Sequence, residues 1–498
     1  MNVNPITRLD YPDPDVIRVE DTYYMVSTTM HFMPGCEILQ SFDLVHWEHV
    51  TYVYETLDHT DAQQLKSGQN IYGQGMWAAS LRYHEGRFYI CFVANDTRKT
   101  YLYTSEKIDG PWKKQLIEGF YHDGSLLFDE DGRNYIVYGN DEIWITELNE
   151  DLTAPKKDGL HRLLVSDHKN PELGYEGSHI QKINGYYYIF LIHSLRDRWM
   201  RTEACFYSDS LEGEFTGGDV LCDDRGYCGQ GMAQGGIVDT PDGKWYAMLF
   251  QDSGAVGRLP ILLPVTWKDH FPVFGQNGHV PEEIEVHSTR PGYIYQPLVG
   301  SDDFCNGLLP RWQFNHDPDP RYYHLDALQG TYTITTREVC TELTQAVNTL
   351  TQRMSYPSCA AEVTVDASAL KEGDVAGLCA LQGCYAAVGI TKHHGKYEVL
   401  MLDKKEDGIL DMTEGTVVES HQMDFRLEAD FCNMKDEARC YYRVNKGDWL
   451  PIGTVHKLYF KLDHFTGCRF GLFCYAAEET GGSACFRDFK YYDVDEIS

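Results

Sequence analysis

Residues 124–139 read GSLLFDEDGRNYIVYG: an apolar run, a polar turn around Gly132, and a second run rich in aromatic and β-branched residues. Such runs are typical of β-strands, and a glycine in the turn permits the positive φ that a tight hairpin needs. Helical periodicity is weak along the chain, so an α/β fold is disfavoured. This segment therefore predicts a β-hairpin, and its repetition decides the fold.

The same pattern occurs five times within the first 290 residues. The other copies are residues 15–27 (DVIRVEDTYYMVS), 79–93 (ASLRYHEGRFYICFV), 178–192 (SHIQKINGYYYIFLI) and 236–250 (GIVDTPDGKWYAMLF). The turns at Asp21, Gly86, Gly132, Gly185 and Gly243 are 65, 46, 53 and 58 residues apart, long enough for one four-stranded sheet each. Five such units predict an all-β fold that begins with a five-bladed β-propeller over residues 1–290. A sandwich built from the same hairpins is the alternative.

The sequence pattern changes after the fifth hairpin unit. The segment 262–275 (LLPVTWKDHFPVFG) ends the last blade, and residues 288–304, which contain Pro and Gly, are expected to cross to a second domain. Short alternating strands follow, among them GTYTITT at 330–336, KYEVLML at 396–402 and RFGLFCYA at 469–476. They predict a β-sandwich over residues 301–498.

Charge and composition exclude several classes of partner. The 498 residues include 75 Asp and Glu against 43 Lys and Arg, a formal net charge of −32. Such a surface repels nucleic acid and anionic lipid. The sequence contains no run of 18 apolar residues, the length that a membrane-spanning helix needs. A small neutral ligand remains, and an aromatic content of 13% suits sugar stacking as well as β-cores.

The chain's start and its cysteines bear on its compartment. The start, MNVNPITRLDYPDPDV, has no basic segment followed by an apolar one, so no secretory signal is expected. The 15 cysteines are scattered, and no two form C-x-x-C, which argues against a zinc ribbon. A reduced, cytoplasmic protein is expected, and a homo-oligomer remains open.

The repeat selects five positions at one rim of the propeller. Nine residues before the turns of blades two to five stand Trp77, Asp123, Glu176 and Gln234, and Asp13 stands eight before Asp21. Taken singly, each has an ordinary structural explanation, such as a turn aspartate or a core tryptophan. Together they place three carboxylates, an indole and an amide where the inner strands begin.

Three carboxylates beside a neutral ligand are typical of glycoside hydrolysis. One carboxylic acid protonates the leaving oxygen, and one carboxylate activates water or attacks the sugar. The alternative is a divalent metal site, but no EF-hand or histidine-rich spacing accompanies these residues.

Several segments resemble glycoside hydrolase family 43. They include residues 4–29 (NPITRLDYPDPDVIRVEDTYYMVSTT), 32–48 (FMPGCEILQSFDLVHWE), 122–139 (HDGSLLFDEDGRNYIVYG) and 175–190 (YEGSHIQKINGYYYIF). The resemblance extends over residues 4–275. From DDFCNGLLPRWQFNH (302–316) onward the chain is similar to the C-terminal domain of the family's β-xylosidase-like members.

The resemblance implies an inverting hydrolase on a five-bladed propeller and assigns roles by motif. Asp13, in PDP, matches the general base that activates water. Glu176, in EGSH, matches the general acid, and Asp123, in HDGS, matches the carboxylate that orients the acid and modulates its pKa. Three further residues are similar to groups that hold or wall in the terminal sugar: Arg258, Phe32 and Trp77.

Two positions depart from the family's pattern. Many members carry a histidine associated with calcium where this chain has Gln234. This departure argues against a metal there, although an amide oxygen can ligate calcium. Asp15 replaces a small polar residue and is expected behind the site. The hydrolysis itself is expected to need no cofactor.

Two long polar loops bear on the mode of action. Residues 56–75 enter blade two and residues 193–203 lie in blade four; either could wall the axis, which favours exo action. The sequence therefore predicts a β-xylosidase that releases terminal β-D-xylose from small neutral xylo-oligosaccharides. An α-L-arabinofuranosidase, or an enzyme with both activities, is the alternative, and a non-catalytic sugar-binding propeller is the remote one.

Overall fold

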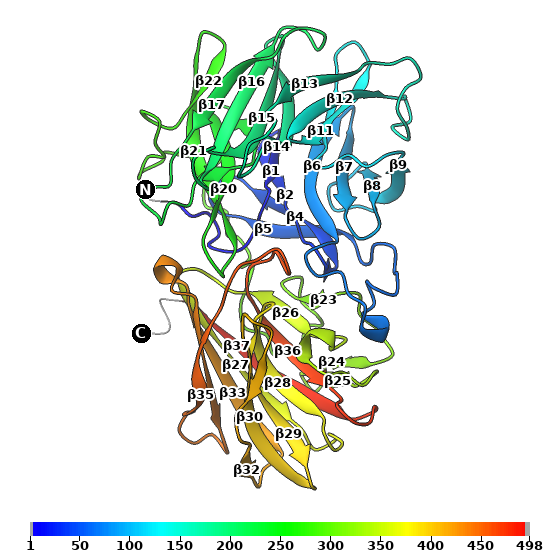
Figure 1. The fold of residues 1–498 in the computed structure, drawn as a ribbon, viewed down its shortest axis with the longest axis vertical. Helices are drawn as coiled ribbons and strands as arrows, with labels where there is room; N and C mark the ends of the chain where they lie inside the picture. Colours follow the sequence, from blue (N-terminus) through cyan, green and yellow to red (C-terminus); the bar gives the residue numbers. More distant parts are fainter. Residues whose placement is uncertain (1–2, 494–498) are drawn as a thin grey trace.

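Five β-sheets surround a common axis in the first half of the computed structural model, which describes residues 3–493 (Figure 1). The strands of blades 1 and 2 are β1 (Asp15–Val19), β2 (Thr22–Val26), β4 (Gly35–Ser41), β5 (Glu48–Tyr54), β6 (Met76–His84), β7 (Arg87–Ala94), β8 (Lys99–Ser105) and β9 (Lys113–Ile117). Blade 3 consists of β10 (Ser125–Phe128), β11 (Asn134–Asn140), β12 (Glu142–Leu148) and β13 (His161–Ser166). Blade 4 consists of β14 (Glu176–Ile183), β15 (Tyr186–Ser194), β16 (Arg201–Ser208) and β17 (Thr216–Leu221). Blade 5 consists of β18 (Met232–Ala233), β19 (Ile237–Asp239), β20 (Trp245–Asp252), β21 (Arg258–Lys268) and β22 (Phe271–Phe274).

The five predicted hairpins form the inner strand pairs of the blades. In blade 3, Ser125 pairs with Val137 and Phe128 with Asn134 across a turn in which Gly132 has φ 82°. A residue with a Cβ rarely adopts that conformation, so glycine at the turn permits the register. The five-bladed β-propeller is therefore confirmed.

The second domain is a sandwich of two antiparallel sheets. One sheet contains β23 (Gln313–Asn315), β26 (Leu350–Arg353), β28 (Val375–Leu381), β29 (Ala386–His393), β30 (Lys396–Lys404), β31 (Leu410–Met412), β32 (Thr416–Val418) and β36 (Arg469–Tyr475). The other contains β24 (Tyr323–Asp326), β25 (Thr331–Thr335), β27 (Ser358–Asp366), β33 (Gln422–Asp430), β34 (Glu437–Arg443), β35 (Leu450–Lys457) and β37 (Ser483–Asp493). Three short 3₁₀ turns complete the elements: η1 (Lys66–Gly68), η2 (Leu343–Gln345) and η3 (Cys432–Met434).

One propeller segment belongs to the sandwich. The two-residue strand β3 (Phe32–Met33) pairs with β23, so that Met33 lies opposite Phe314 and Phe32 opposite Asn315. The nine-stranded sheet therefore starts in blade 1, and the two domains share backbone hydrogen bonds. Figure 1 shows this junction between the propeller above and the sandwich below.

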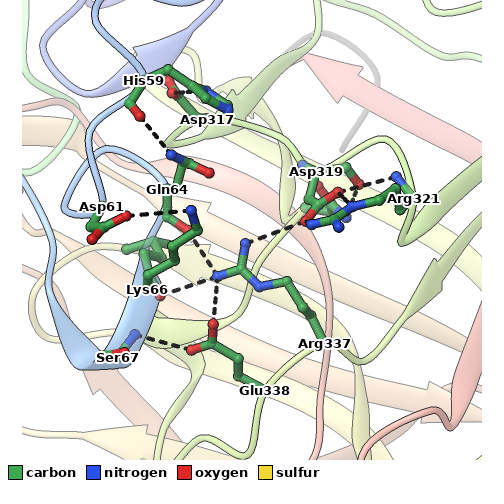
Figure 2. A network of polar contacts seen from close by, with 12 residues as sticks. His59, Asp61, Gln64, Lys66, Ser67, Asp317, Asp319, Arg321, Arg337 and Glu338 are labelled. Atoms are coloured by element: carbon green, nitrogen blue, oxygen red, sulfur yellow. Dashed lines mark hydrogen bonds and ion pairs between the residues drawn. The ribbon is translucent and has the colours of Figure 1, made fainter.

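The loop at residues 56–75 is a second connection between the domains (Figure 2). Its His59 Nδ1 lies 2.8 Å from Asp317 Oδ2, and the amide nitrogen of Ser67 donates to Glu338 (3.1 Å). Arg337, whose side chain is 7% exposed, donates to the carbonyl of Gln64 at 2.9 Å. This loop, one of the two expected to wall the axis, docks on the sandwich.

Two observations concern cysteines and membranes. All fifteen cysteines are free thiols, and most are buried. Within residues 3–493 no helix is long and apolar enough to cross a membrane.

Candidate active site

The five predicted rim positions stand where the inner strands begin. Asp13 and Asp123 each precede their strand by two residues, and Glu176 opens β14. Asp13, Asp123 and Gln234 have φ of 52°, 47° and 59°, in the left-handed region that aspartate tolerates better than most residues. The chain therefore turns sharply at the rim before it enters the strand.

Asp13 is held by two donors and is 6% exposed. Arg258 Nη1 donates to its Oδ1 at 3.0 Å, and Thr28 Oγ1 donates to its Oδ2 at 2.5 Å. Each carboxylate oxygen accepts one of these bonds and keeps a second lone pair, so the group can still accept a proton from water.

Asp123 and Glu176 meet across blades 3 and 4. Asp123 Oδ2 accepts from the amide nitrogen of Gly177 at 3.0 Å, which ties it to the residue after Glu176. Burial, together with the nearby carboxylates of Glu176 and Asp13, raises the pKa of Asp123 although the charge of His122 opposes the shift. Asp123 is thus coupled electrostatically to both other carboxylates.

Two residues of blade 3 contact the carboxylate of Glu176. Asn140 Nδ2 donates to Glu176 Oε2 at 2.7 Å, and His122 Nε2 lies 3.3 Å from the same oxygen and 3.6 Å from Asp123 Oδ2. Burial alone would lower the pKa of His122, but Asp123 and the hydrogen bond to Glu176 raise it to about 9. His122 is therefore an imidazolium near neutral pH.

Asp15 lies behind these groups and ties three blades together. Its Oδ2 accepts from Arg82 Nη1 at 2.8 Å and from the amide of Leu81 at 2.7 Å, while its Oδ1 lies 3.1 Å from His179 Nδ1. Burial alone would raise the pKa of Asp15, but Arg82 and His179 lower it. Asp15 is thus a structural anion that fixes the strands bearing the site.

A cavity of about 530 Å³ opens onto Glu176 and is built by both domains. Propeller residues on its wall include Trp77, Leu173, Trp199, Arg201, Gln230 and Asp252. The sandwich supplies Met434, Phe460, Lys461, Leu462 and Phe465. Of the two loops expected to wall the axis, residues 193–203 contribute to the cavity through Trp199 and Arg201, whereas no residue of 56–75 lines it.

The sandwich also covers the arginine that holds Asp13. Arg258 is 2% exposed, and its guanidinium carbon lies 4.2 Å from the ring centroid of Phe465. The centroid of the same ring lies 5.4 Å from the ring centroid of Trp77. The ring of Phe465 therefore links the Asp13–Arg258 pair to the aromatic wall of the cavity.

Phe32 is buried in the sandwich core, whereas Gln234 stands at the predicted rim but does not line the cavity. Phe32 is 2% exposed in the sandwich core, with the guanidinium of Arg469 3.4 Å from its ring centroid, because β3 joins the sandwich sheet. Gln234 is 4% exposed, and its side chain packs against Gly177, where an added Cβ would lie 2.7 Å from it. Neither residue lines the cavity, so the wall predicted for Phe32 is formed by other residues.

The donor atoms near the axis do not fit calcium. Within residues 3–493, one group of three His, Cys, Asp or Glu side chains brings its ligand atoms within 4.8 Å of one another: His122, Asp123 and Glu176. This group includes an imidazole nitrogen, whereas calcium takes oxygen ligands, typically six to eight. Gln234 does not belong to this group.

Some site residues carry little or no signal in the sequence. His122 and Asn140 stand within or beside the quoted segment 122–139, and their proximity to Glu176 arises only when blades 3 and 4 pack together. Phe465 and Leu462 come from a domain whose strand pattern has no chemical signature, so no local signal could have indicated them.

Comparisons with known proteins agree with the fold. The family model described as "Glycosyl hydrolases family 43" matches residues 3–272, and a "Beta xylosidase C-terminal Concanavalin A-like domain" model matches residues 301–492. A β-xylosidase of Formosa agariphila is 27% identical over 99% of this chain and 89% of its own length. A xylosidase/arabinosidase of Butyrivibrio fibrisolvens is 24% identical over 99% of both chains.

A solved structure extends the comparison. The structure described as a bifunctional GH43-CE of Bacteroides eggerthii superposes with a TM-score of 0.92 and 42% identity over 98% of this chain. The chain spans 63% of that structure's chain. The match of the family model over more than half of the residues, on the propeller that carries the three carboxylates, shows that the protein belongs to glycoside hydrolase family 43.

Proposed function

We propose that the protein is an exo-acting, inverting glycoside hydrolase that releases terminal β-D-xylose from short, neutral xylo-oligosaccharides. The observation that carries the proposal is the position of Glu176 on the wall of a cavity of about 530 Å³, with Asp123 and Asp13 buried close to it. A carboxyl pair of this kind supplies the acid and the base that glycoside hydrolysis needs.

The chemistry follows from the two carboxylates. Glu176, protonated, donates its proton to the glycosidic oxygen as the bond from that oxygen to the anomeric carbon breaks. Asp13 removes a proton from water, whose oxygen attacks the opposite face of the anomeric carbon. The products are the departing alcohol and a sugar of inverted configuration, and two further proton exchanges with solvent restore both carboxyl groups.

The other polar groups keep the two carboxylates in place. Arg258 and Thr28 hold Asp13 through one oxygen each, which fixes the direction of its free lone pairs. Asp123 holds the backbone beside Glu176 through the amide of Gly177. Since these groups provide the acid, the base and their orientation, we propose that hydrolysis needs no cofactor.

Exo action is supported by the sandwich. Phe460, Leu462 and Phe465 of the sandwich line the cavity together with propeller residues such as Trp199. A cavity walled from two domains admits the end of an oligosaccharide more readily than the middle of a long chain.

Arabinofuranose is the alternative sugar, and the name of the Butyrivibrio fibrisolvens relative includes both activities. The test compares hydrolysis of an aryl β-D-xylopyranoside with that of an aryl α-L-arabinofuranoside, with Glu176→Gln as the control for contaminating enzymes. We expect the xylopyranoside to have the higher kcat/KM. A clear preference for the arabinofuranoside would reverse the choice of sugar, and turnover of neither would favour a binding protein.

A further inference from the structure

We propose that His122 is a positioning residue for the general acid: it holds Glu176 through Oε2, so that the transferable proton stands on Oε1, and it stabilises the carboxylate formed when that proton leaves. This inference rests on the proposed function, because it assigns a partner to the acid of that reaction.

The first argument is geometric. Glu176 Oε2 accepts from Asn140 Nδ2 at 2.7 Å and lies 3.3 Å from His122 Nε2. An oxygen that accepts two N–H groups is disfavoured as the site of a proton, since its lone pairs are occupied. No hydrogen bond reaches Oε1 from the residues that the structure describes. The proton of the neutral acid therefore stands on Oε1, free for transfer to a bound sugar.

The second argument concerns charge. The imidazolium of His122 faces Asp123 on its own segment, Glu176 from β14 and Asp13 from blade 1, and these carboxylates raise the pKa of His122 to about 9 against the opposing effect of burial. Glu176 is neutral before the reaction and anionic after it, whereas the carboxylate of Asp123, the largest of the effects that raise the pKa of His122, faces the ring in both states. A fixed cation 3.3 Å from Oε2 therefore stabilises the state after transfer more than the state before it.

The third argument is the support of the ring itself. The carbonyl of His122 accepts from the amide of Gly139 at 3.0 Å, which anchors the residue to the end of β11. Its ring packs beside Trp77 at 6.1 Å between centroids, and its side chain is 20% exposed. Asn140, the second donor to Glu176, follows Gly139 directly, so this backbone hydrogen bond links the two residues of blade 3 that contact Glu176. His122 is thus held in place before substrate binds.

The test uses His122→Asn and His122→Phe with a series of aryl glycosides of the preferred sugar, from 2,4-dinitrophenyl to unsubstituted phenyl. A good leaving group needs no proton, whereas a poor one does. We expect His122→Phe to lower kcat by about 10²-fold for the phenyl glycoside, the order of a general-acid contribution, and by less than about threefold for the dinitrophenyl glycoside. The kcat of His122→Asn for the phenyl glycoside should lie between that of the wild type and that of His122→Phe. In both variants the alkaline limb of the pH profile should move to higher pH, because the cation that favours loss of the acid's proton is gone.

The matched control is His161→Asn, at the first residue of β13 in the same blade, where the ring stacks on Trp144 at 5.1 Å. This substitution should leave kcat unchanged for every aryl glycoside in the series. Equal losses for every leaving group in the His122 variants, or no loss, would overturn the inference. Glu176→Gln separates this inference from the proposed function. If the loss of kcat in Glu176→Gln grows from the dinitrophenyl to the phenyl glycoside while the loss in His122→Phe is the same for every leaving group, only the role of His122 is refuted. If the loss of kcat in Glu176→Gln is the same for every leaving group, the assignment of Glu176 as the acid is refuted, and this inference with it.

Discussion

Arg258 Nη1 donates to Asp13 Oδ1 at 3.0 Å, and the two side chains are only 3% and 8% exposed. Arg258 opens β21 in blade 5 and Asp13 precedes β1 in blade 1, so the contact joins the last blade to the first. Since Phe465 of the sandwich covers the guanidinium, the environment of the proposed base depends on both domains.

Replacement of Arg258 by lysine should impair catalysis although it keeps the charge. A lysine lacks the planar fork that lets one guanidinium contact Asp13 and pack against Phe465 at the same time. We expect kcat/KM to fall by about tenfold to a hundredfold, within the range for a disturbed buried charge pair. The measurement is steady-state kinetics on the preferred aryl glycoside. Arg290→Lys, at an exposed pair with Asp21, is the control, and equal kinetics for the two variants would contradict the role of Arg258.

Asp13→Asn and Glu176→Gln should each lower kcat by about 10³-fold or more, because each removes one of the two proton-transfer groups. The fold should persist, since both amides keep the shape of the side chain. Circular dichroism and the Tm test the fold, and steady-state kinetics test the activity. Near-normal turnover in either variant would refute that residue's role.

Phe465→Ala should raise KM about fivefold to tenfold, the effect of losing about 1 kcal/mol of apolar contact between the cavity wall and the sugar. The ring lies between Arg258 and Trp77, so its loss opens one wall of the cavity. Leu328→Ala, at a sandwich residue that is 94% exposed, is the control and should not change KM. An unchanged KM in Phe465→Ala would show that the sandwich does not contribute to substrate binding.

The interdomain ion pair between Glu37 and Arg353, 2.8 Å apart and nearly inaccessible, should make stability depend on pH. Burial alone would raise the pKa of Glu37, but Arg353 and His49 lower it from 4.5 to about 2. A lowered carboxyl pKa stabilises the fold above the ordinary value, and the contribution is lost as pH falls toward 2.

Glu37→Gln therefore should reduce the free energy of unfolding by about 3–5 kcal/mol at pH 7, because Arg353 is left buried without its partner. The gap between wild type and variant should shrink as the pH falls from 4.5 toward 2. Urea denaturation at several pH values measures it, with Asp131→Asn at an exposed pair as a control. A gap that stays constant down to pH 2 would contradict the assignment.

The sequence is sufficient to predict the propeller and the register of its rim because both are local. Hairpin turns such as the one at Gly132 need a positive φ, and strand alternation places residues at a fixed distance from that turn. A spacing of nine residues from the turn consequently selects Asp123 and Glu176, and a spacing of eight residues selects Asp13.

Contacts between domains are not predictable in the same way. The family resemblance implies a position in the pocket for Phe32, yet β3 pairs with β23 across the junction and carries this residue into the sandwich core. Phe465 lies 388 residues beyond Trp77 in the sequence and reaches the cavity only because the sandwich docks against the propeller. Docking depends on surface complementarity, which strand periodicity does not encode.

The stereochemistry of hydrolysis tests the central claim most directly. ¹H NMR of the first sugar formed from an aryl β-D-xylopyranoside, recorded before mutarotation, distinguishes the two anomers. If Asp13 activates water for attack opposite the leaving group, α-xylose appears first and β-xylose follows by mutarotation. Initial formation of β-xylose would show retention, and it would contradict both the role of Asp13 as a base and the inverting mechanism built on it.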